Sequence, residues 1–290
     1  MSGLADQVAQ AYCAACLAEL DALKPGNVHR FASGHGMDIA DFERSAQVSA
    51  EPIARSGARI GARIRNAISA TQAAVRVNTN LGIVLLCAPL AAAAALEGDD
   101  LRAALAGALN GLDLADADDT FAAIAQANPG GLGHAPSHDV NAPARVTLRE
   151  AMAAAAGRDR IARQYDSNFE DIFTLGLTSL ALARARPLGP QWATLAVYLT
   201  YLAAFPDTHI SRKFGPLVAQ AVQSEAAPWP ARLAGAGDPA KLVAPLLEFD
   251  ASLKARGLNP GTSADLTVAT LFAETLAKQR RDHLALSPQQ

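Results

Sequence analysis

The sequence has few aromatic residues and no excess of charge of either sign. Only 5% of its 290 residues are Phe, Trp or Tyr, which leaves few large rings to fill the interior of a β-sandwich or β-barrel. The formal net charge is −3, and no block of like charge stands out. Without a basic excess the chain has no general means of holding nucleic-acid phosphates, so nucleic acid is not an expected partner.

Cysteines and long apolar runs are also scarce. Cys13 and Cys16 have C-x-x-C spacing, but they lie inside a helical pattern and Cys87 is the only other cysteine. Core thiols are therefore favoured over a metal or redox pair. The longest apolar stretch, residues 81–96, is shorter than the ~20 residues that a bilayer requires, and no signal-peptide pattern is recognisable at the start. We expect a cytoplasmic protein without a membrane partner.

Hydrophobic residues make up 50% of the sequence, and alanine supplies much of that half. Alanine has the highest helix propensity, and small side chains allow helices to pack closely. We find neither the alternation typical of strands nor an internal repeat. The sequence therefore predicts an all-α protein, with residues 1–290 forming a single compact multi-helix domain. A homodimer is compatible with such helices, although no pattern identifies an interface.

Helical spacing and turn residues divide the chain into segments. Residues 228–239, rich in Pro, Gly and Ala, are expected to form an exposed loop, and residues 27–37 another. The segment 53–74 carries arginines at helical intervals, which favours a solvated helix face over phosphate contacts. Helices are expected over residues 4–23, 38–52, 101–114, 120–127, 147–165, 172–186 and 192–204, and over stretches beginning near 81, 216 and 262.

The polar stretch 258–266 precedes the long C-terminal helix. Pro260 and Gly261 favour a tight turn, Thr262 or Ser263 can cap the helix, and Asp265 would fall in its first turn. The same residues can be read as a capping box or as part of a site. The functional interpretation gains weight because three similar polar stretches occur upstream, at residues 24–31, 77–82 and 206–213.

Two of these upstream stretches lie beside helix starts. Asn78 and Thr79 precede an apolar helix, where they would either cap it or help to bind an anion such as phosphate. The stretch 206–213 combines a carboxylate, an imidazole and two cations between apolar helices. Near the first stretch, Asp38, Asp41 and Ser45 share one helix face; the aspartates either cap that helix or face a ligand.

Two further motifs favour structural roles. Asp116, Asp118 and Asp119 are close enough in sequence to bind Mg²⁺, but such a cluster more often marks a helix start. The Gly-rich stretch 128–134 ends in His134 and has His138 nearby, yet it lacks the Lys-Ser/Thr of a P-loop and follows no strand. A metal-dependent hydrolase using these histidines is the least favoured interpretation, because no His pair has i, i+4 spacing.

Taken in order, these motifs resemble the triphosphoribosyl-dephospho-CoA synthase family over nearly the whole chain. The residues that carry the resemblance are Lys24, Pro25, Gly26, Asn27, Met37, Asp38, Phe42, Ser45, Asn78, Thr79, Gly82, Pro206, Asp207, Thr208, Arg212, Gly215, Pro260, Gly261, Ser263, Asp265 and Leu266. The family is all-helical. Its reaction transfers the triphosphoribosyl unit of ATP to a ribose hydroxyl of 3′-dephospho-CoA and releases adenine.

The resemblance implies an ATP-using transferase assisted by Mg²⁺, with small nucleotides as its partners. The candidates for catalytic and metal-binding carboxylates are Asp38, Asp207 and Asp265. The candidates for contacts with phosphate or ribose are Lys24, Asn27, Arg30, Asp41, Ser45, Asn78, Thr79, His209, Arg212, Lys213 and Ser263.

Two positions depart from the family pattern. The family carries His-x-Asp before the residue that corresponds to Met37, where this chain has Gly34, His35 and Gly36. The second motif normally continues with His-Lys, where this chain has Asn80 and Leu81. These departures suggest a divergent branch. The alternatives are a transferase that makes a pterin or furan one-carbon carrier, and a non-catalytic nucleotide-binding subunit.

Overall fold

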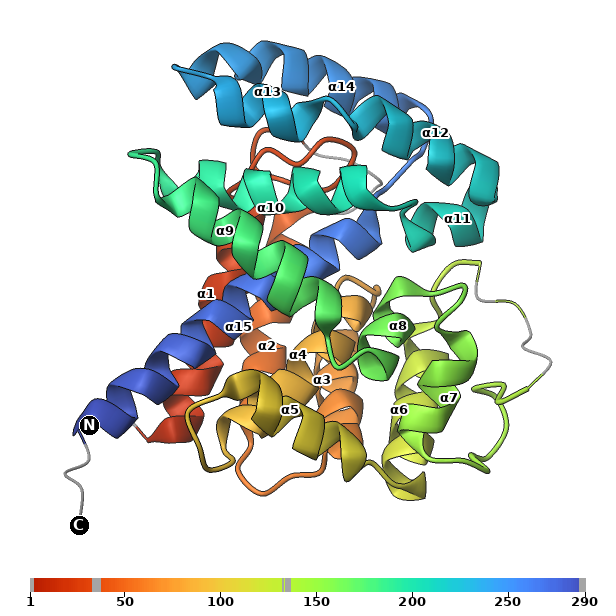
Figure 1. Ribbon diagram of the computed structural model, residues 1–290. Helices are drawn as coiled ribbons and strands as arrows, with labels where there is room; N and C mark the ends of the chain where they lie inside the picture. Colours follow the sequence, from red (N-terminus) through yellow and green to blue (C-terminus); the bar gives the residue numbers. More distant parts are fainter. Residues whose placement is uncertain (1–2, 33–37, 132, 134–136, 287–290) are drawn as a thin grey trace. The chain divides into compact units, whose positions relative to one another are not determined.

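The computed structural model describes residues 3–32, 38–131, 133 and 137–286 (Figure 1). Every regular element in these ranges is a helix, and the only β-type pairing is an isolated bridge between His29 and Ala32. The predicted all-α class is confirmed. The elements are α1 (Leu4–Leu20), α2 (Ile39–Ala54), α3 (Ile60–Val75), α4 (Leu81–Ala94), α5 (Leu101–Asn110), α6 (Leu114–Ala127), α7 (Leu148–Ala155), α8 (Arg160–Asp166), the π-helix η1 (Asp171–Gly176), α9 (Leu177–Arg184), α10 (Pro190–Ala204), α11 (Thr208–Phe214), α12 (Pro216–Ala226), α13 (Trp229–Gly235), the 3₁₀-helix η2 (Pro239–Leu242), α14 (Val243–Ala255) and α15 (Gly261–Leu286).

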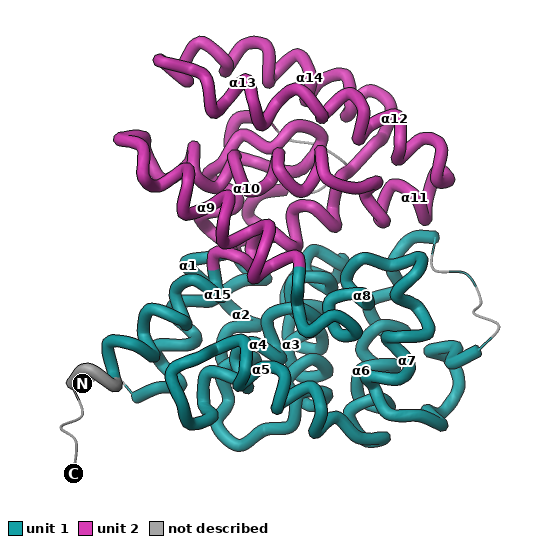
Figure 2. Tube along the Cα trace, in the orientation of Figure 1, with its two compact units in different colours: residues 1–15, 44–170, 272–290 teal, residues 16–43, 171–271 magenta. Residues whose placement is uncertain are grey.

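The chain forms two compact units, each assembled from separated stretches (Figure 2). Unit 1 contains residues 1–15, 44–170 and 272–290, and unit 2 contains residues 16–43 and 171–271. Three helices, α1, α2 and α15, contribute residues to both units. Neither unit is therefore a continuous piece of sequence, and the single 1–290 domain stays a prediction.

Unit 1 is built around α4, which packs against α3, α5 and α8. Nearly every residue of α4 is buried, as expected of a helix that is apolar on all sides. Pro89 lies within it and has no N–H to donate to the carbonyl of Leu85, four residues earlier. The Tyr165 hydroxyl donates to that carbonyl at 2.6 Å. A buried tyrosine thus supplies the donor that the proline removes.

The carboxyl end of α4 is held by one arginine from α15. The Arg280 guanidinium donates to the carbonyls of Ala93 and Leu96 at 2.8 Å and to that of Gly98 at 2.6 Å. It also donates to the carbonyls of Ala94 and Glu97. Helix ends carry unpaired carbonyls and partial negative charge, so one buried cation binds the last two carbonyls of α4 and three carbonyls of the turn that follows.

Replacing Arg280 with methionine is expected to lower the free energy of unfolding by about 2 kcal/mol, because buried carbonyls then lose a charged donor. Chemical denaturation followed by circular dichroism measures this. Arg281→Met is the control; Arg281 is exposed on the same helix, so its replacement should change stability by less than about 0.5 kcal/mol. Equal effects of the two substitutions would contradict a capping role for Arg280.

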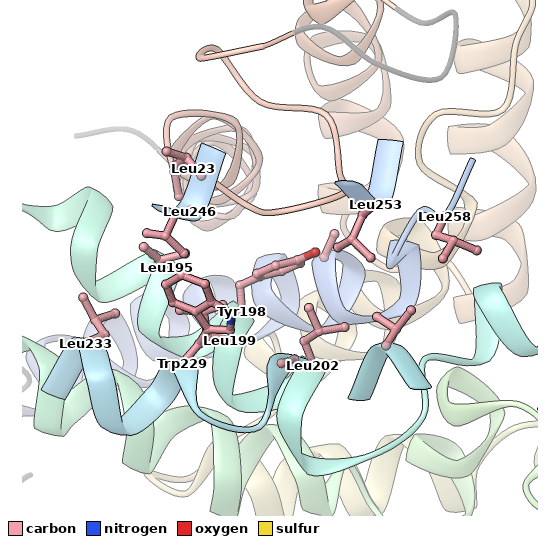
Figure 3. Packing of buried hydrophobic residues seen from close by; sticks show 14 of the residues in the cluster. Leu23, Leu195, Tyr198, Leu199, Leu202, Trp229, Leu233, Leu246, Leu253 and Leu258 are labelled. Carbon is pink, nitrogen blue, oxygen red and sulfur yellow. The ribbon is translucent and has the colours of Figure 1, made fainter. Parts of the chain in front are cut away.

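Unit 2 has its own apolar core between α10, α12, α13 and α14 (Figure 3). Trp229, 6% exposed, contributes from α13 and stacks on Phe249 with ring centroids 5.8 Å apart. The prediction of an exposed loop over residues 228–239 is therefore wrong for α13. The small alanines and glycines of that stretch allow a short helix, and a tryptophan anchors it.

Other differences concern helix boundaries and one arginine. Arg63 is 3% exposed, and its guanidinium donates to the carbonyls of Ile53 and Ala58, so the arginine segment is not a uniformly solvated face. Helix α6 begins at Leu114, where Asp113 and Asp116 form a capping box. The Asp116 cluster therefore belongs to a helix start, as favoured from the sequence, although that start is earlier than predicted.

Candidate active site

Three of the four polar stretches meet within unit 2. The turn at Gly26 approaches the turn before α15 so closely that a Cβ at Gly26 would lie 2.9 Å from Cδ of Pro260. A Cβ at Gly261 would lie 2.6 Å from Nδ1 of His209, at the start of α11. Gly26 also has φ of +81°, a conformation that side chains strongly disfavour. Glycine is required at both positions because side chains of the neighbouring turns, Pro260 and His209, pack directly on the glycine backbone.

The first turn is anchored by a buried ion pair. The Lys24 ammonium is fully buried and donates to the carboxylate of Glu19, to Oδ1 of Asn27 at 2.7 Å and to the carbonyl of Val28 at 2.8 Å. Burial lowers the pKa of Lys24 and raises that of Glu19, and each charge opposes the shift of the other. All three ammonium hydrogens have acceptors, so this lysine holds the loop and has no hydrogen left for a phosphate.

Asp207 joins the other two turns. Its Oδ1 accepts the amides of His209 and Ile210 at 2.9 and 3.3 Å, and so caps α11. Its Oδ2 accepts the amide and hydroxyl of Ser263 at 2.8 and 2.9 Å, at the start of α15. Burial raises the pKa of Asp207, and the hydrogen bonds from Ser263, Ile210 and His209 partly offset that rise. Asp207 thus caps two helices that are distant in sequence.

This geometry corrects the expected capping of α15. Neither Thr262 nor Ser263 is an N-cap, since the helix already begins at Gly261; the capping carboxylate comes from Asp207. The Thr262 hydroxyl accepts the amide of His209 at 3.1 Å and pairs with Thr208 at 3.0 Å. Asp265 follows the first turn of α15 and is half-buried. Its charge acts on Lys24, which places the carboxylate near the buried ion pair.

A second carboxylate, Asp250 on α14, also binds the first turn. It accepts the amide of Gly26 at 2.8 Å and lies 3.3 Å from Nε2 of His29 and 2.9 Å from Nζ of Lys254. Burial alone would raise its pKa, but these three donors outweigh that effect and lower the pKa of Asp250. Lys254 also donates to the carbonyl of Ala32 at 3.0 Å.

The hydrogen bonds of His29 determine its tautomer. Its Nδ1 accepts the amide of Phe31 at 3.2 Å, so Nδ1 carries no hydrogen and Nε2 donates to Asp250. Burial lowers the pKa of His29, with the neighbouring Lys254 charge acting in the same direction. A neutral imidazole therefore connects the loop to α14.

The remaining predicted residues of unit 2 lie at its surface or at helix ends. Asp38 is exposed and Asp41 accepts its amide at 3.4 Å, which supports the capping interpretation for this pair. Arg30 forms ion pairs with Asp21 and Glu43. Arg212 and Lys213 occupy the last turn of α11, where cations interact favourably with the helix dipole.

The fourth polar stretch belongs to unit 1. Oδ1 of Asn78 accepts the amide of Leu81, the first residue of α4, at 3.2 Å, whereas the N-cap position is Asn80, whose side chain forms no capping hydrogen bond. The hydroxyls of Thr79 and Ser45 bond to each other, and the amide nitrogen of Asn80 donates to Ser49 and Thr71. The expected N-cap at Asn78 or Thr79 is therefore displaced to Asn80, although Asn78 still binds the first amide of the helix; Ser45 and Thr79 belong to a buried, uncharged network.

The described residues do not form a ready metal centre. Among them, no three His, Cys, Asp or Glu side chains group closely enough to hold an ion, and Asp38, Asp207 and Asp265 are no exception. The three cysteines form no disulfide; Cys16 and Cys87 are buried and Cys13 is half-buried, as favoured for core thiols. In the ranges covered by the structure no helix could span a membrane. Gly34, His35, Gly36 and His134 lie outside the described residues.

Sequence reasoning missed Glu19, Asp250 and Lys254. Asp250 and Lys254 are four residues apart on α14, the spacing of an ion pair on one helix face, but no helix was predicted there. Glu19 is an acidic residue near the end of an apolar helix, five positions before a lysine. The sequence contains both patterns, but neither pattern predicts which residue of the loop is bound. Gly26 and Asp250, for example, are 224 residues apart.

The regular elements of the described residues are all helices, and the polar groups of the site gather where turns meet. In P-loop and dinucleotide-binding proteins, phosphates bind between a strand and a helix. The chain therefore belongs to neither of these classes. The family model named CitG, described as ATP:dephospho-CoA triphosphoribosyl transferase, matches residues 5–283, and the chain belongs to this family. The family assigned by resemblance is confirmed.

A curated relative agrees with this assignment, and a solved structure shares the fold. A probable 2-(5″-triphosphoribosyl)-3′-dephosphocoenzyme-A synthase from Pseudomonas fluorescens is 30% identical over 227 residues, which cover 78% of this chain and 69% of the relative. The crystal structure of a candidate triphosphoribosyl-dephospho-CoA synthase from Archaeoglobus fulgidus superposes with a TM-score of 0.59 at 24% identity. It covers 81% of this chain and 97% of that one, and it supports the fold.

Proposed function

We propose that this protein transfers the triphosphoribosyl unit of ATP to a ribose hydroxyl of 3′-dephospho-CoA and releases adenine. The observation that carries the proposal is that three of the motifs behind the family resemblance, at residues 24–31, 206–213 and 258–266, converge in unit 2. Side chains of one turn pack on the glycines of another, and a carboxylate of one turn accepts an amide of another. The family match over residues 5–283 supports the same reaction. Neither a one-carbon-carrier transferase nor a non-catalytic subunit is favoured by the relatives.

The reaction breaks the bond between C1 of the ATP ribose and N9 of adenine, and the electron pair leaves with adenine. The acceptor hydroxyl forms the new bond to C1, and its proton ends on adenine. Positive charge develops at the sugar in such displacements, so a carboxylate beside C1 or beside the attacking hydroxyl lowers the barrier. We assign this role to Asp265, because Asp207 already uses both oxygens to cap helices.

The triphosphate requires cations, and the cluster itself is rich in carboxylates. Lys254, which retains one ammonium hydrogen beyond its bonds to Asp250 and Ala32, is our first candidate, with Arg212 and Lys213 at the end of α11. The predicted three-aspartate metal site does not fit the geometry. We therefore treat Mg²⁺ as part of the substrate, MgATP, and assign it no protein ligand.

The test is chromatographic detection of free adenine from ATP and Mg²⁺, with and without 3′-dephospho-CoA. We expect adenine only when the acceptor is present. Replacing Asp265 by asparagine should lower kcat by about 100-fold in a protein that still folds, since general base or charge-stabilising groups contribute effects of this order. Asp99→Asn, at an exposed position of unit 1, is the control for the loss of one carboxylate.

Adenine release by Asp265→Asn at the wild-type rate would remove Asp265 from the mechanism. Absence of adenine from the wild-type protein would contradict the proposed reaction itself. A cytoplasmic location and a homodimer are further proposals from the composition, and size-exclusion chromatography with light scattering tests the second.

A further inference from the structure

Two asparagine amides connect the buried ion pair to the turn before α15. Oδ1 of Asn27 accepts from the Lys24 ammonium at 2.7 Å, and Nδ2 of Asn27 donates to Oδ1 of Asn259 at 2.7 Å. Asn27 is 7% exposed, whereas Asn259 is partly exposed. Among the residues that the structure describes, none accepts a hydrogen bond from Nδ2 of Asn259.

The orientation of both amides follows from Lys24. An asparagine amide has one accepting and one donating end, and rotation exchanges them. Lys24 donates toward Asn27, because an ammonium nitrogen has hydrogens to donate and no lone pair with which to accept. This holds wherever the shared proton of the Lys24–Glu19 pair resides, since a neutral amine still has two hydrogens for Asn27 and Val28. Asn27 therefore presents Nδ2 to Asn259, and Asn259 must turn its own Nδ2 outward.

Asn259 consequently offers hydrogen-bond donors, and no acceptor, to a ligand at the turn. Two positive groups lie on either side of it. It stands two residues before the N-terminus of α15, where Asp207 already accepts the Ser263 amide and the other first amides carry partial positive charge. Lys254 belongs to the neighbouring end of α14, where Leu253 packs on Gly26 beside Pro260. Phosphate oxygens accept hydrogen bonds and have no hydrogens to donate when ionised, so they match this arrangement better than ribose hydroxyls or an amino group.

We propose that Asn259 is a specificity-determining residue that donates a hydrogen bond to a phosphate oxygen of the nucleoside triphosphate, with its orientation fixed by the Lys24–Asn27 relay. This inference rests on the proposed function for the identity of the nucleotide. The relay gives the buried Lys24 a role at this turn, although Lys24 itself has no hydrogen left for a ligand. Through Asn27, Lys24 determines which end of the partly exposed Asn259 amide faces outward.

Asn259→Asp is the decisive variant, since it keeps an oxygen for Asn27 and replaces the outward donor by a carboxylate oxygen of the same size. Isothermal titration calorimetry with ATP and with inorganic tripolyphosphate, each with Mg²⁺, measures binding. We expect both affinities to fall by the same factor, at least about tenfold, as for loss of a hydrogen bond to a charged group. Asn66→Asp, an equal charge change at an exposed site in unit 1, should bind both probes as the wild type does.

The outcomes separate three possibilities. If Asn259→Asp weakens ATP but not tripolyphosphate, the amide faces the sugar or base and the phosphate assignment is overturned. Unchanged binding of both probes would overturn any recognition role, as would failure of the wild type to bind tripolyphosphate. If the wild type binds the probe but releases no adenine, the proposed reaction fails while the comparison of variants still decides the role of Asn259.

Asn27→Asp tests the relay itself. The new carboxylate would accept from Lys24 and from Asn259 at once, so the Asn259 amide would rotate and present its oxygen to the ligand. We expect tripolyphosphate affinity to fall by about the same factor as in Asn259→Asp, although Asn27 is buried. A folded Asn27→Asp protein that binds tripolyphosphate as tightly as the wild type would overturn the relay; should it not fold, the Asn259→Asp comparison decides alone.

Discussion

Replacing Lys24 by methionine is expected to lower the free energy of unfolding by about 3–5 kcal/mol, the cost of leaving one partner of a buried ion pair alone. Glu19 is 4% exposed and would have to remain charged without its counter-ion or take up a proton. Asn27 and the Val28 carbonyl would lose their donor as well. Denaturant titration of the wild type and the variant, followed by circular dichroism, measures the difference.

The double variant Lys24→Met with Glu19→Leu separates the ion pair from the packing. It removes both charges and restores an apolar interior, so it should recover at least about half of the lost stability. Arg55→Met is the control, because its ion pair with Glu51 is exposed and is worth no more than about 0.5 kcal/mol. A loss below about 1 kcal/mol in the single Lys24 variant would contradict a structural role for the pair.

The fold class was predictable because it depends on local properties. Alanine content and helical spacing are read from neighbouring residues, and both predict helices. The exceptions occur where a residue distant in sequence determines burial or helix formation. Arg63 is buried because carbonyls at Ile53 and Ala58 need a donor, and α13 forms where Trp229 finds a core. Boundaries shifted for the same reason, since caps such as Asp113 outweigh the apolar pattern.

The turns that form the site were predictable, but the hydrogen bonds that join them were not. Pro, Gly and Asn mark positions where the backbone bends tightly, and three of the four marked stretches meet in unit 2. Which side chain serves which turn depends on pairs far apart in the chain, such as Asp207 with Ser263 or Gly26 with Asp250. Lys24 and Asp207 were expected at the ligand because of their charge, whereas burial and fully used hydrogen bonds favour positioning roles.

Asp207→Ala is expected to lower the free energy of unfolding by about 4 kcal/mol. The substitution leaves the amides of Ile210 and Ser263 without an acceptor in a buried site and leaves the His209 amide with only the Thr262 hydroxyl; each unsatisfied donor costs about 1–3 kcal/mol. Asp207→Asn should restore little of this stability, because each carboxylate oxygen accepts from two donors and an NH₂ group cannot replace either.

Asp100→Ala provides a matched control for the local part of that effect. Asp100 caps α5 by accepting the amides of Arg102 and Ala103 at 2.8 and 3.2 Å, nearly the distances that Asp207 shows on α11, but it is exposed and binds no second helix. Its loss should cost about 1 kcal/mol. The difference between the two substitutions measures what Asp207 contributes by joining α11 to α15. Equal costs would show that each turn is formed without the other, and Asp207 would then be an ordinary helix cap.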